Sequence, residues 1–140
     1  MKISLIQIGS GDDKEVNFQK ANKYIAEATT QKADIVCLPE VFLYSGDDEI
    51  AKMEKTSSRY LTAFQELAKT KRINIILGSV LFLDELTNKP KNTCFVIDRQ
   101  GKIVYRYDKQ YMYDVERKDL TYRESDTVEP GSEIGFFELD

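Results

Sequence analysis

The sequence predicts an α/β domain with a mixed sheet and with helices on one face of that sheet. Strand-like apolar runs alternate with stretches of helical periodicity, in the order βαβαβββ. The chain has 140 residues, of which 41% are hydrophobic and 31% charged, a balance typical of globular proteins. We therefore expect residues 1–140 to belong to a single domain, without repeats or linkers.

The first half of the chain reads as strand, helix, strand and helix. Asp12 or Asp13 precedes the first helical period and is a suitable N-cap, because its charge favours the positive end of the helix dipole. Ser57 or Ser58 has the same position before the second period. The predicted elements are a strand at Lys2–Ile8, a helix at Lys14–Gln31, a buried strand at Asp34–Leu38 and a helix at Ser57–Lys71.

The second half is predicted to be mainly strands. Asp98 to Gly101 form a turn signal between two of them, and Gly135–Leu139 looks like the start of another strand. Residues 110–129 are polar, rich in aromatic residues and without clear period, so we expect a long loop. Two helices cover only one face of the sheet, so the other face needs more polypeptide or a partner. The predicted strands are Ile73–Leu83, Thr93–Ile97 and Lys102–Tyr107.

Composition excludes several classes of function. The net charge of −4 argues against nucleic-acid binding, which depends on basic surface. No apolar run is long enough to cross a bilayer, and the N-terminus has no signal-peptide pattern, so we expect a cytoplasmic protein that does not bind membranes. The chain has no histidine, which removes Ser-His-Asp and Cys-His catalysis and imidazole-bound zinc. We expect no metal and no cofactor, and acid–base chemistry from carboxylate, lysine, tyrosine or thiol groups.

Two charged residues follow predicted strands at positions where the sites of α/β proteins collect. Glu40 ends the buried apolar strand, and burial there would raise the pKa of its carboxyl group towards the range of a general base. Lys109 opens the long loop, and its ammonium could stabilise a developing oxyanion. The alternatives are a glutamate that merely leaves the strand and an ordinary surface lysine. By itself, the loop that contains Glu124 gives no functional signal.

Taken together, three blocks of this sequence resemble the nitrilase superfamily of carbon–nitrogen hydrolases. Residues 33–42 form an apolar strand that ends in Pro-Glu, and the hairpin at 92–104 leads to Tyr107-Asp108-Lys109. Glu124-Ser125 then precedes Pro130-Gly131. The order and spacing agree over nearly all 140 residues. The resemblance implies the N-terminal half of a four-layer α-β-β-α sandwich, most similar to the branch of omega-amidases and deaminated-glutathione amidases.

The resemblance also implies roles for the site residues. Glu40 would be the general base that activates a thiol, and Lys109 would hold the tetrahedral oxyanion. Glu124 would be a second glutamate that positions the substrate and supports Lys109. The implied reaction is hydrolysis of a small carboxylated amide through a thioester. Tyr111 stands where the family usually has a histidine, which leaves the branch and the substrate open.

The nucleophile of the family is a cysteine on the strand after the Pro-Gly turn, and these 140 residues stop before it. Cys37 and Cys94 lie inside apolar runs, so we expect both in the core and not in a disulfide. The resemblance thus implies a truncated domain, inactive alone, that pairs with a missing C-terminal half or forms homo-oligomers and acts on a small-molecule amide. The alternatives are a non-catalytic module for binding or assembly and a thiol enzyme that uses Cys37.

Overall fold

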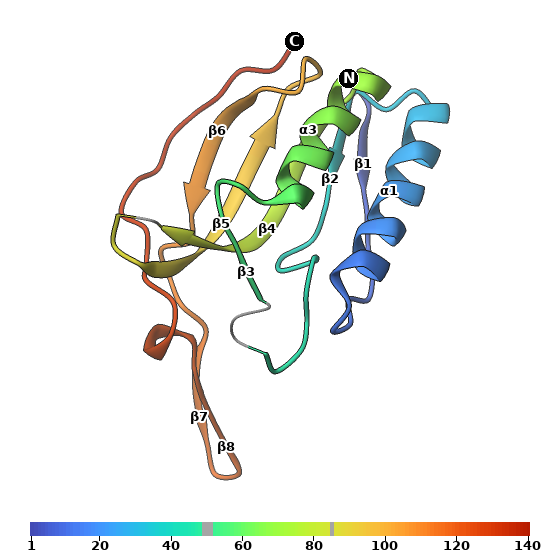
Figure 1. Ribbon diagram of the computed structural model, residues 1–140. Coiled ribbons are helices and arrows are strands. Elements are labelled where there is room, and N and C mark those ends of the chain that lie inside the picture. Colours follow the sequence, from blue (N-terminus) through green and yellow to red (C-terminus); the bar gives the residue numbers. More distant parts are fainter. Residues whose placement is uncertain (49–51, 85) are drawn as a thin grey trace.

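A computed structural model describes residues 1–48, 52–84 and 86–140 and has the predicted mixed sheet (Figure 1). The strand order is β1-β2-β4-β5-β6, and β3 pairs with β4 off this path. Strands β1, β2 and β4 are parallel to one another, whereas β4, β5 and β6 are antiparallel. The strands are β1 (Ile3–Leu5), β2 (Ile35–Cys37), β3 (Met53–Glu54), β4 (Asn74–Asp84), β5 (Lys89–Ile97) and β6 (Ile103–Asp108).

Both long helices, α1 (Lys14–Thr30) and α3 (Arg59–Lys71), lie on one face of this sheet, as predicted (Figure 1). Asp13 caps α1, because its carboxylate accepts hydrogen bonds from two backbone N–H groups of the first turn. The hydroxyl of Ser58 caps α3 in the same way. The sequence offered two candidates for each cap, and the structure selects the residue nearest the helix in both cases.

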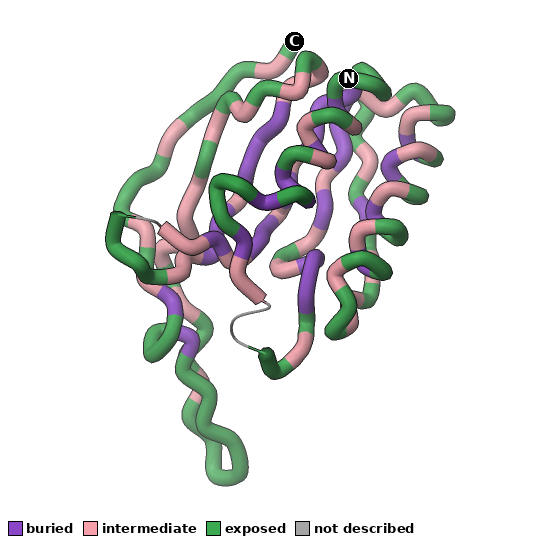
Figure 2. The backbone as a smooth tube through the Cα atoms, in the orientation of Figure 1, coloured by how far each residue is buried: buried purple, intermediate pink, exposed green. Residues whose placement is uncertain are grey.

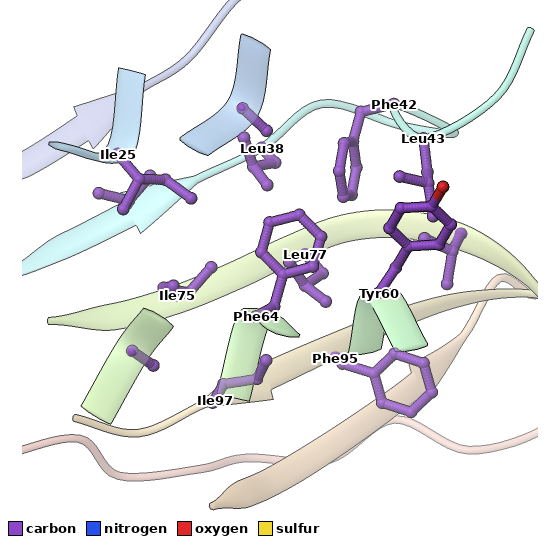
Figure 3. Packing of buried hydrophobic residues seen from close by; sticks show 14 of the residues in the cluster. Ile25, Leu38, Phe42, Leu43, Tyr60, Phe64, Ile75, Leu77, Phe95 and Ile97 are labelled. Carbon is purple, nitrogen blue, oxygen red and sulfur yellow. The ribbon is translucent and has the colours of Figure 1, made fainter. Parts of the chain in front are cut away.

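The hydrophobic core fills the space between the helices and the sheet (Figure 3). The ring of Phe64 on α3 packs edge-on against Phe42, with 5.6 Å between centroids, and against Phe18 of α1, with 5.1 Å. Phe82 on β4 and Phe95 on β5 make a similar contact at 5.2 Å. Such pairs contribute about 0.5–1.5 kcal/mol beyond their buried area. The core therefore anchors β4, β5 and the segment just after β2, which carry the candidate site.

The other face of the sheet is covered by no helix in the part of the chain that the structure describes. On β1, Ile3 and Leu5 are both exposed, whereas Ser4 between them pairs with the buried Val36 of β2. The C-terminal segment is exposed or half-buried along its whole length (Figure 2). The C-terminal segment runs beside β6, where the ring of Phe137 stacks on Tyr105 at 5.2 Å. This half-covered sheet agrees with the predicted half of a sandwich.

Some predicted boundaries are wrong. The first strand is limited to Ile3–Leu5, because its neighbour β2 offers only three residues for pairing. Residues 110–129 contain a projecting hairpin of β7 (Asp114–Arg117) and β8 (Leu120–Arg123) (Figure 1). Almost every hairpin residue is exposed, so its sequence shows no apolar alternation. Residues 135–139 form no strand. Among the described residues, no helix combines the length and the apolar character that crossing a membrane requires.

Candidate active site

Glu40 and Lys109 meet at one end of the sheet. Glu40 follows β2, and Lys109 follows β6, where its backbone N–H donates to the carbonyl of Asn92 on β5 at 2.9 Å. Lys109 Nζ donates to Glu40 Oε1 at 2.8 Å. The structure thus brings together two side chains that are 69 positions apart and that the sequence predicted to share a site.

Glu124 joins this contact from the short helix η1 (Glu124–Asp126). Its Oε2 accepts hydrogen bonds from Lys109 Nζ at 2.9 Å and from the backbone N–H of Tyr113 at 2.6 Å. Burial raises the pKa of Glu124, but hydrogen bonds from this N–H and from two side chains outweigh burial, and the pKa lies below its ordinary value. Glu124 is therefore ionised at neutral pH.

Lys109 lies between two carboxylates of different accessibility. Burial lowers the pKa of Lys109, whereas its hydrogen bonds to Glu40 and Glu124 raise it, and the net pKa is above the ordinary value. Lys109 is therefore charged at neutral pH. The side chain of Glu40 is 58% exposed, whereas that of Glu124 is 8% exposed. Of the two carboxylates, only Glu40 is thus open to a reacting molecule. The buried Glu124 holds the Lys109 ammonium in place through its hydrogen bond.

A break in the regular pairing of β4 shapes the turn that carries Glu40. The pairing of β4 with β5 is irregular between Leu77 and Val80, at Gly78 and Ser79. A Cβ atom on Gly78 would lie 1.8 Å from the carbonyl oxygen of Leu38, so only glycine permits the approach of this residue, which follows β2. The hydroxyl of Ser79 accepts a hydrogen bond at 3.1 Å from the backbone N–H of the residue after Glu40.

That residue, Val41, is strained. Its φ of 47° lies in the left-handed region, which a β-branched side chain rarely adopts. Strain of this kind persists only where surrounding contacts fix the conformation, and it is frequent at functional sites. Here the fixing contacts are the Ser79 hydroxyl and the Ser79 N–H, which donates to the carbonyl of Pro39 at 3.0 Å. The strained turn holds Glu40 at the edge of the sheet.

Sequence reasoning named Asn92 only as part of a hairpin, yet Asn92 contacts both glutamates of the site. Its Nδ2 donates to Glu40 Oε1 at 2.9 Å and to Glu124 Oε1 at 3.2 Å. The available signal was a polar residue at the start of an apolar strand, which is also typical of a strand end that faces solvent. The sequence offered no means of choosing between these interpretations.

An open hollow of about 210 Å³ lies beside these groups. Glu40 and Lys109 face it, and Cys94 forms part of its wall. In the described part of the chain, no three cysteine, aspartate or glutamate side chains gather in a group that could hold a metal ion. The lining residues of the hollow are Glu40, Gly78, Ser79, Asn92, Cys94, Tyr107 and Lys109.

The two cysteines are not core residues as expected, because both are partly exposed. Side chains alternate along β2, so Val36 faces the helices and Cys37 faces the open side of the sheet. Burial raises the pKa of Cys94 to about 11, with a further contribution from Cys37, whose own pKa burial also raises. Both are therefore protonated at neutral pH, whereas a reactive thiol has a lowered pKa.

Comparison with known proteins gives the relatives of this chain. The profile of the carbon-nitrogen hydrolase family matches residues 2–140. The omega-amidase of Homo sapiens is 32% identical over 98% of this chain and 50% of its own length. The deaminated glutathione amidase of Dictyostelium discoideum is 31% identical over 95% of this chain and 50% of its own length. The chain spans about half the length of these curated relatives.

Solved structures show the same relationship. The Caenorhabditis elegans NitFhit protein superposes with a TM-score of 0.83 at 29% identity, over 94% of this chain and 33% of that one. Saccharomyces cerevisiae Nit3, a member of the nitrilase superfamily, gives a TM-score of 0.78 at 25% identity, over 95% of this chain and 49% of that one. Both comparisons support the predicted resemblance. By its sequence match and its nitrilase-type fold, the chain belongs to the carbon-nitrogen hydrolase family.

Proposed function

We propose that Glu40, Lys109 and Glu124 form the acid–base part of an amidase active site. The observation that carries the proposal is the 2.8 Å contact between Lys109 Nζ and Glu40 Oε1 at an open hollow. In this proposal Glu40 is the general base and Lys109 holds the oxyanion. Glu124 keeps Lys109 in place and helps to position the substrate. A lysine whose pKa is raised keeps the positive charge that stabilises an oxyanion.

The proposed reaction is hydrolysis of a small carboxylated amide by a thiol nucleophile. Glu40 takes the thiol proton while sulfur bonds to the amide carbon and the carbonyl electron pair moves to oxygen, where Lys109 donates a hydrogen bond. The C–N bond then breaks, and nitrogen leaves with the proton from Glu40. Water then attacks the thioester while Glu40 takes one of its protons, and the C–S bond breaks as Glu40 returns that proton to the sulfur, which releases the acid and restores the thiol. The relatives named omega-amidase and deaminated glutathione amidase support an amide substrate.

The nucleophilic thiol in this proposal comes from polypeptide outside residues 1–140. Cys94 lines the hollow, but its pKa of about 11 leaves it protonated at neutral pH. Cys37 does not line the hollow, which argues against the alternative of a thiol enzyme that uses it. Residues 1–140 then supply the base and the oxyanion donor. By themselves they are expected not to hydrolyse the amide.

The test is ammonia release from monoamides of dicarboxylic acids. It compares this chain with a longer polypeptide that continues into a cysteine-bearing second half. We expect release only from the longer polypeptide, with Glu40→Gln and Lys109→Ala each lowering kcat by at least about 100-fold. Glu116→Gln and Lys118→Ala on the exposed hairpin are matched controls that should keep full activity. Full activity of Glu40→Gln or Lys109→Ala would rule out the mechanism.

A second candidate is a non-catalytic module that assembles with related chains. The observation that favours it is the exposure of apolar side chains on the open side of the sheet and in the C-terminal segment, where Phe136 is 96% exposed. Large exposed apolar side chains often mark interaction surfaces. This candidate predicts homo-oligomers or complexes with related chains. It also predicts that neither this chain nor a longer polypeptide releases ammonia from an amide. Sedimentation equilibrium combined with the ammonia assay separates the two candidates.

A further inference from the structure

Asn92 lies on β5 with its side chain in the wall of the hollow, and it is only 2% exposed. A single atom, Nδ2, donates to Glu40 Oε1 at 2.9 Å and to Glu124 Oε1 at 3.2 Å. An amide nitrogen has two hydrogens, so these two bonds use both of them. Both hydrogens of the Asn92 side-chain amide are thus donated to the two glutamates.

The two oxygens of Glu40 are unequal as a result. Oε1 accepts from Lys109 Nζ at 2.8 Å and from Asn92 Nδ2 at 2.9 Å, which occupies both of its lone pairs. No described residue donates to Oε2. A proton that arrives at Glu40 therefore has one free acceptor, and this acceptor belongs to a side chain that is more than half exposed.

We propose that Asn92 is a positioning residue that holds Glu40 and Glu124 in register and makes Oε2 the proton-accepting atom of Glu40. The catalytic meaning of this inference rests on the proposed function, whereas its geometric part concerns residues 1–140 alone. Asn92 acts through the glutamates and not on the substrate. Its contribution is orientation: a base whose free oxygen is fixed in direction presents that oxygen to a thiol without first rotating.

The chemical character of asparagine suits this role. Two carboxylates and one ammonium already give the cluster a net charge of −1. Asn92 supplies two more hydrogen-bond donors without adding charge, and its bond to Glu124 favours the ionised form of that carboxylate. Leucine has a similar size and no donor, so Asn92→Leu removes this effect while filling the same space. The pKa of Glu124 should then rise, because one of the bonds that lower it is lost.

The first test uses this chain and needs no turnover. Carboxyl carbon NMR follows the titration of Glu124 in the wild type, in Asn92→Leu and in Asn74→Leu. Asn74 is a matched control, because it is fully buried on the neighbouring strand β4 and contacts neither glutamate. We expect the Glu124 midpoint to move upward only in Asn92→Leu. An unchanged midpoint, or an equal shift in Asn74→Leu, would overturn the inference.

A measurement on the wild type covers the case in which the variant does not fold. The side-chain amide protons of Asn92 should change chemical shift with the same pH midpoint as the Glu124 carboxyl carbon. A side chain that merely fills space would show no such dependence, and that result would overturn the inference.

The second test uses the longer polypeptide. Asn92→Leu should lower kcat about 100-fold, the cost of misplacing a catalytic group by roughly 1 Å, and should move the acid limb of the pH profile upward, with little change in KM. If the wild type releases no ammonia, the proposed function fails, and NMR still decides the geometry of Asn92. If the wild type is active and Asn92→Leu keeps its kcat and pH profile, this inference fails and the proposed function stands.

Discussion

Gly78→Ala tests whether the close approach of Leu38, the residue after β2, to β4 holds the candidate site together. The added Cβ would lie 1.8 Å from the carbonyl oxygen of Leu38, whereas real Cβ atoms essentially never come within 3.0 Å of such an atom. The backbone at Gly78 and that at Leu38 must therefore move apart by at least 1.2 Å, the difference between 3.0 and 1.8 Å. This displacement occurs two residues before Glu40 and acts directly on the turn that carries it.

The cost has two parts. Overpacking of a tight site costs about 1–3 kcal/mol. The separation also stretches the Ser79 N–H bond to Pro39, and a typical hydrogen bond contributes about 0.5–1.5 kcal/mol. We therefore expect Gly78→Ala to lower the free energy of unfolding by about 1.5–4.5 kcal/mol, which is less than the total stability of a typical domain. The chain should stay folded, so the variant can be measured.

Urea denaturation measures this loss, and Gly9→Ala is the control. A Cβ on Gly9 would have no neighbour within 4 Å, so this substitution should change the free energy of unfolding by no more than about 0.5 kcal/mol. The Glu40 carboxyl signal in NMR should move in Gly78→Ala and stay in place in Gly9→Ala. If both variants unfold at the same urea concentration as the wild type, the reasoning about the close approach is refuted.

Three further predictions concern the helices and pH. Asp13→Ala should lower the free energy of unfolding by about 1 kcal/mol through loss of the cap on α1, whereas Asp12→Ala should not; equal losses in urea denaturation would contradict the assignment. Lys14→Met leaves the buried carboxylate of Glu54 without its cation and should cost about 3–5 kcal/mol, much of which the double variant with Glu54→Leu should recover. The lowered pKa of Glu124 stabilises the fold above the ordinary glutamate pKa of about 4.3, and this stability is lost as pH falls through the folded-state pKa. Urea denaturation between about pH 6 and 3 should therefore show a smaller loss of stability for Glu124→Gln than for the wild type, and parallel curves would argue against it.

Local sequence signals predicted the helices well. The helix caps, the buried strand before Glu40 and the helical faces depend on residues close together in the chain, where spacing and side-chain type are informative. The contact between Glu40 and Lys109 was also predictable, because both residues follow strands and because the family resemblance paired them. The roles of these residues in catalysis stay predictions.

Features that depend on pairing between distant segments were not predictable. Hairpin β7–β8 is exposed on both faces, so no apolar alternation marks its strands. Asn92 looks like an ordinary polar residue until β5 brings it against two carboxylates from other parts of the chain. Gly78 likewise shows its importance only beside the backbone of Leu38, just after β2, which lies too close for any side chain at position 78.

The unequal environments of the two glutamates explain how Lys109 could first pair with Glu40 and then hold the oxyanion in the proposed reaction. When Glu40 takes a proton from a thiol, it loses its charge and its attraction for Lys109 falls. One N–H group of the Lys109 ammonium then becomes available to donate a hydrogen bond to the oxyanion, which forms at the same moment. Glu124 remains ionised because its pKa is lowered, so it still holds the ammonium near the reacting carbon. If Glu124 took that proton instead, the lysine would lose its anchor when the oxyanion needs it.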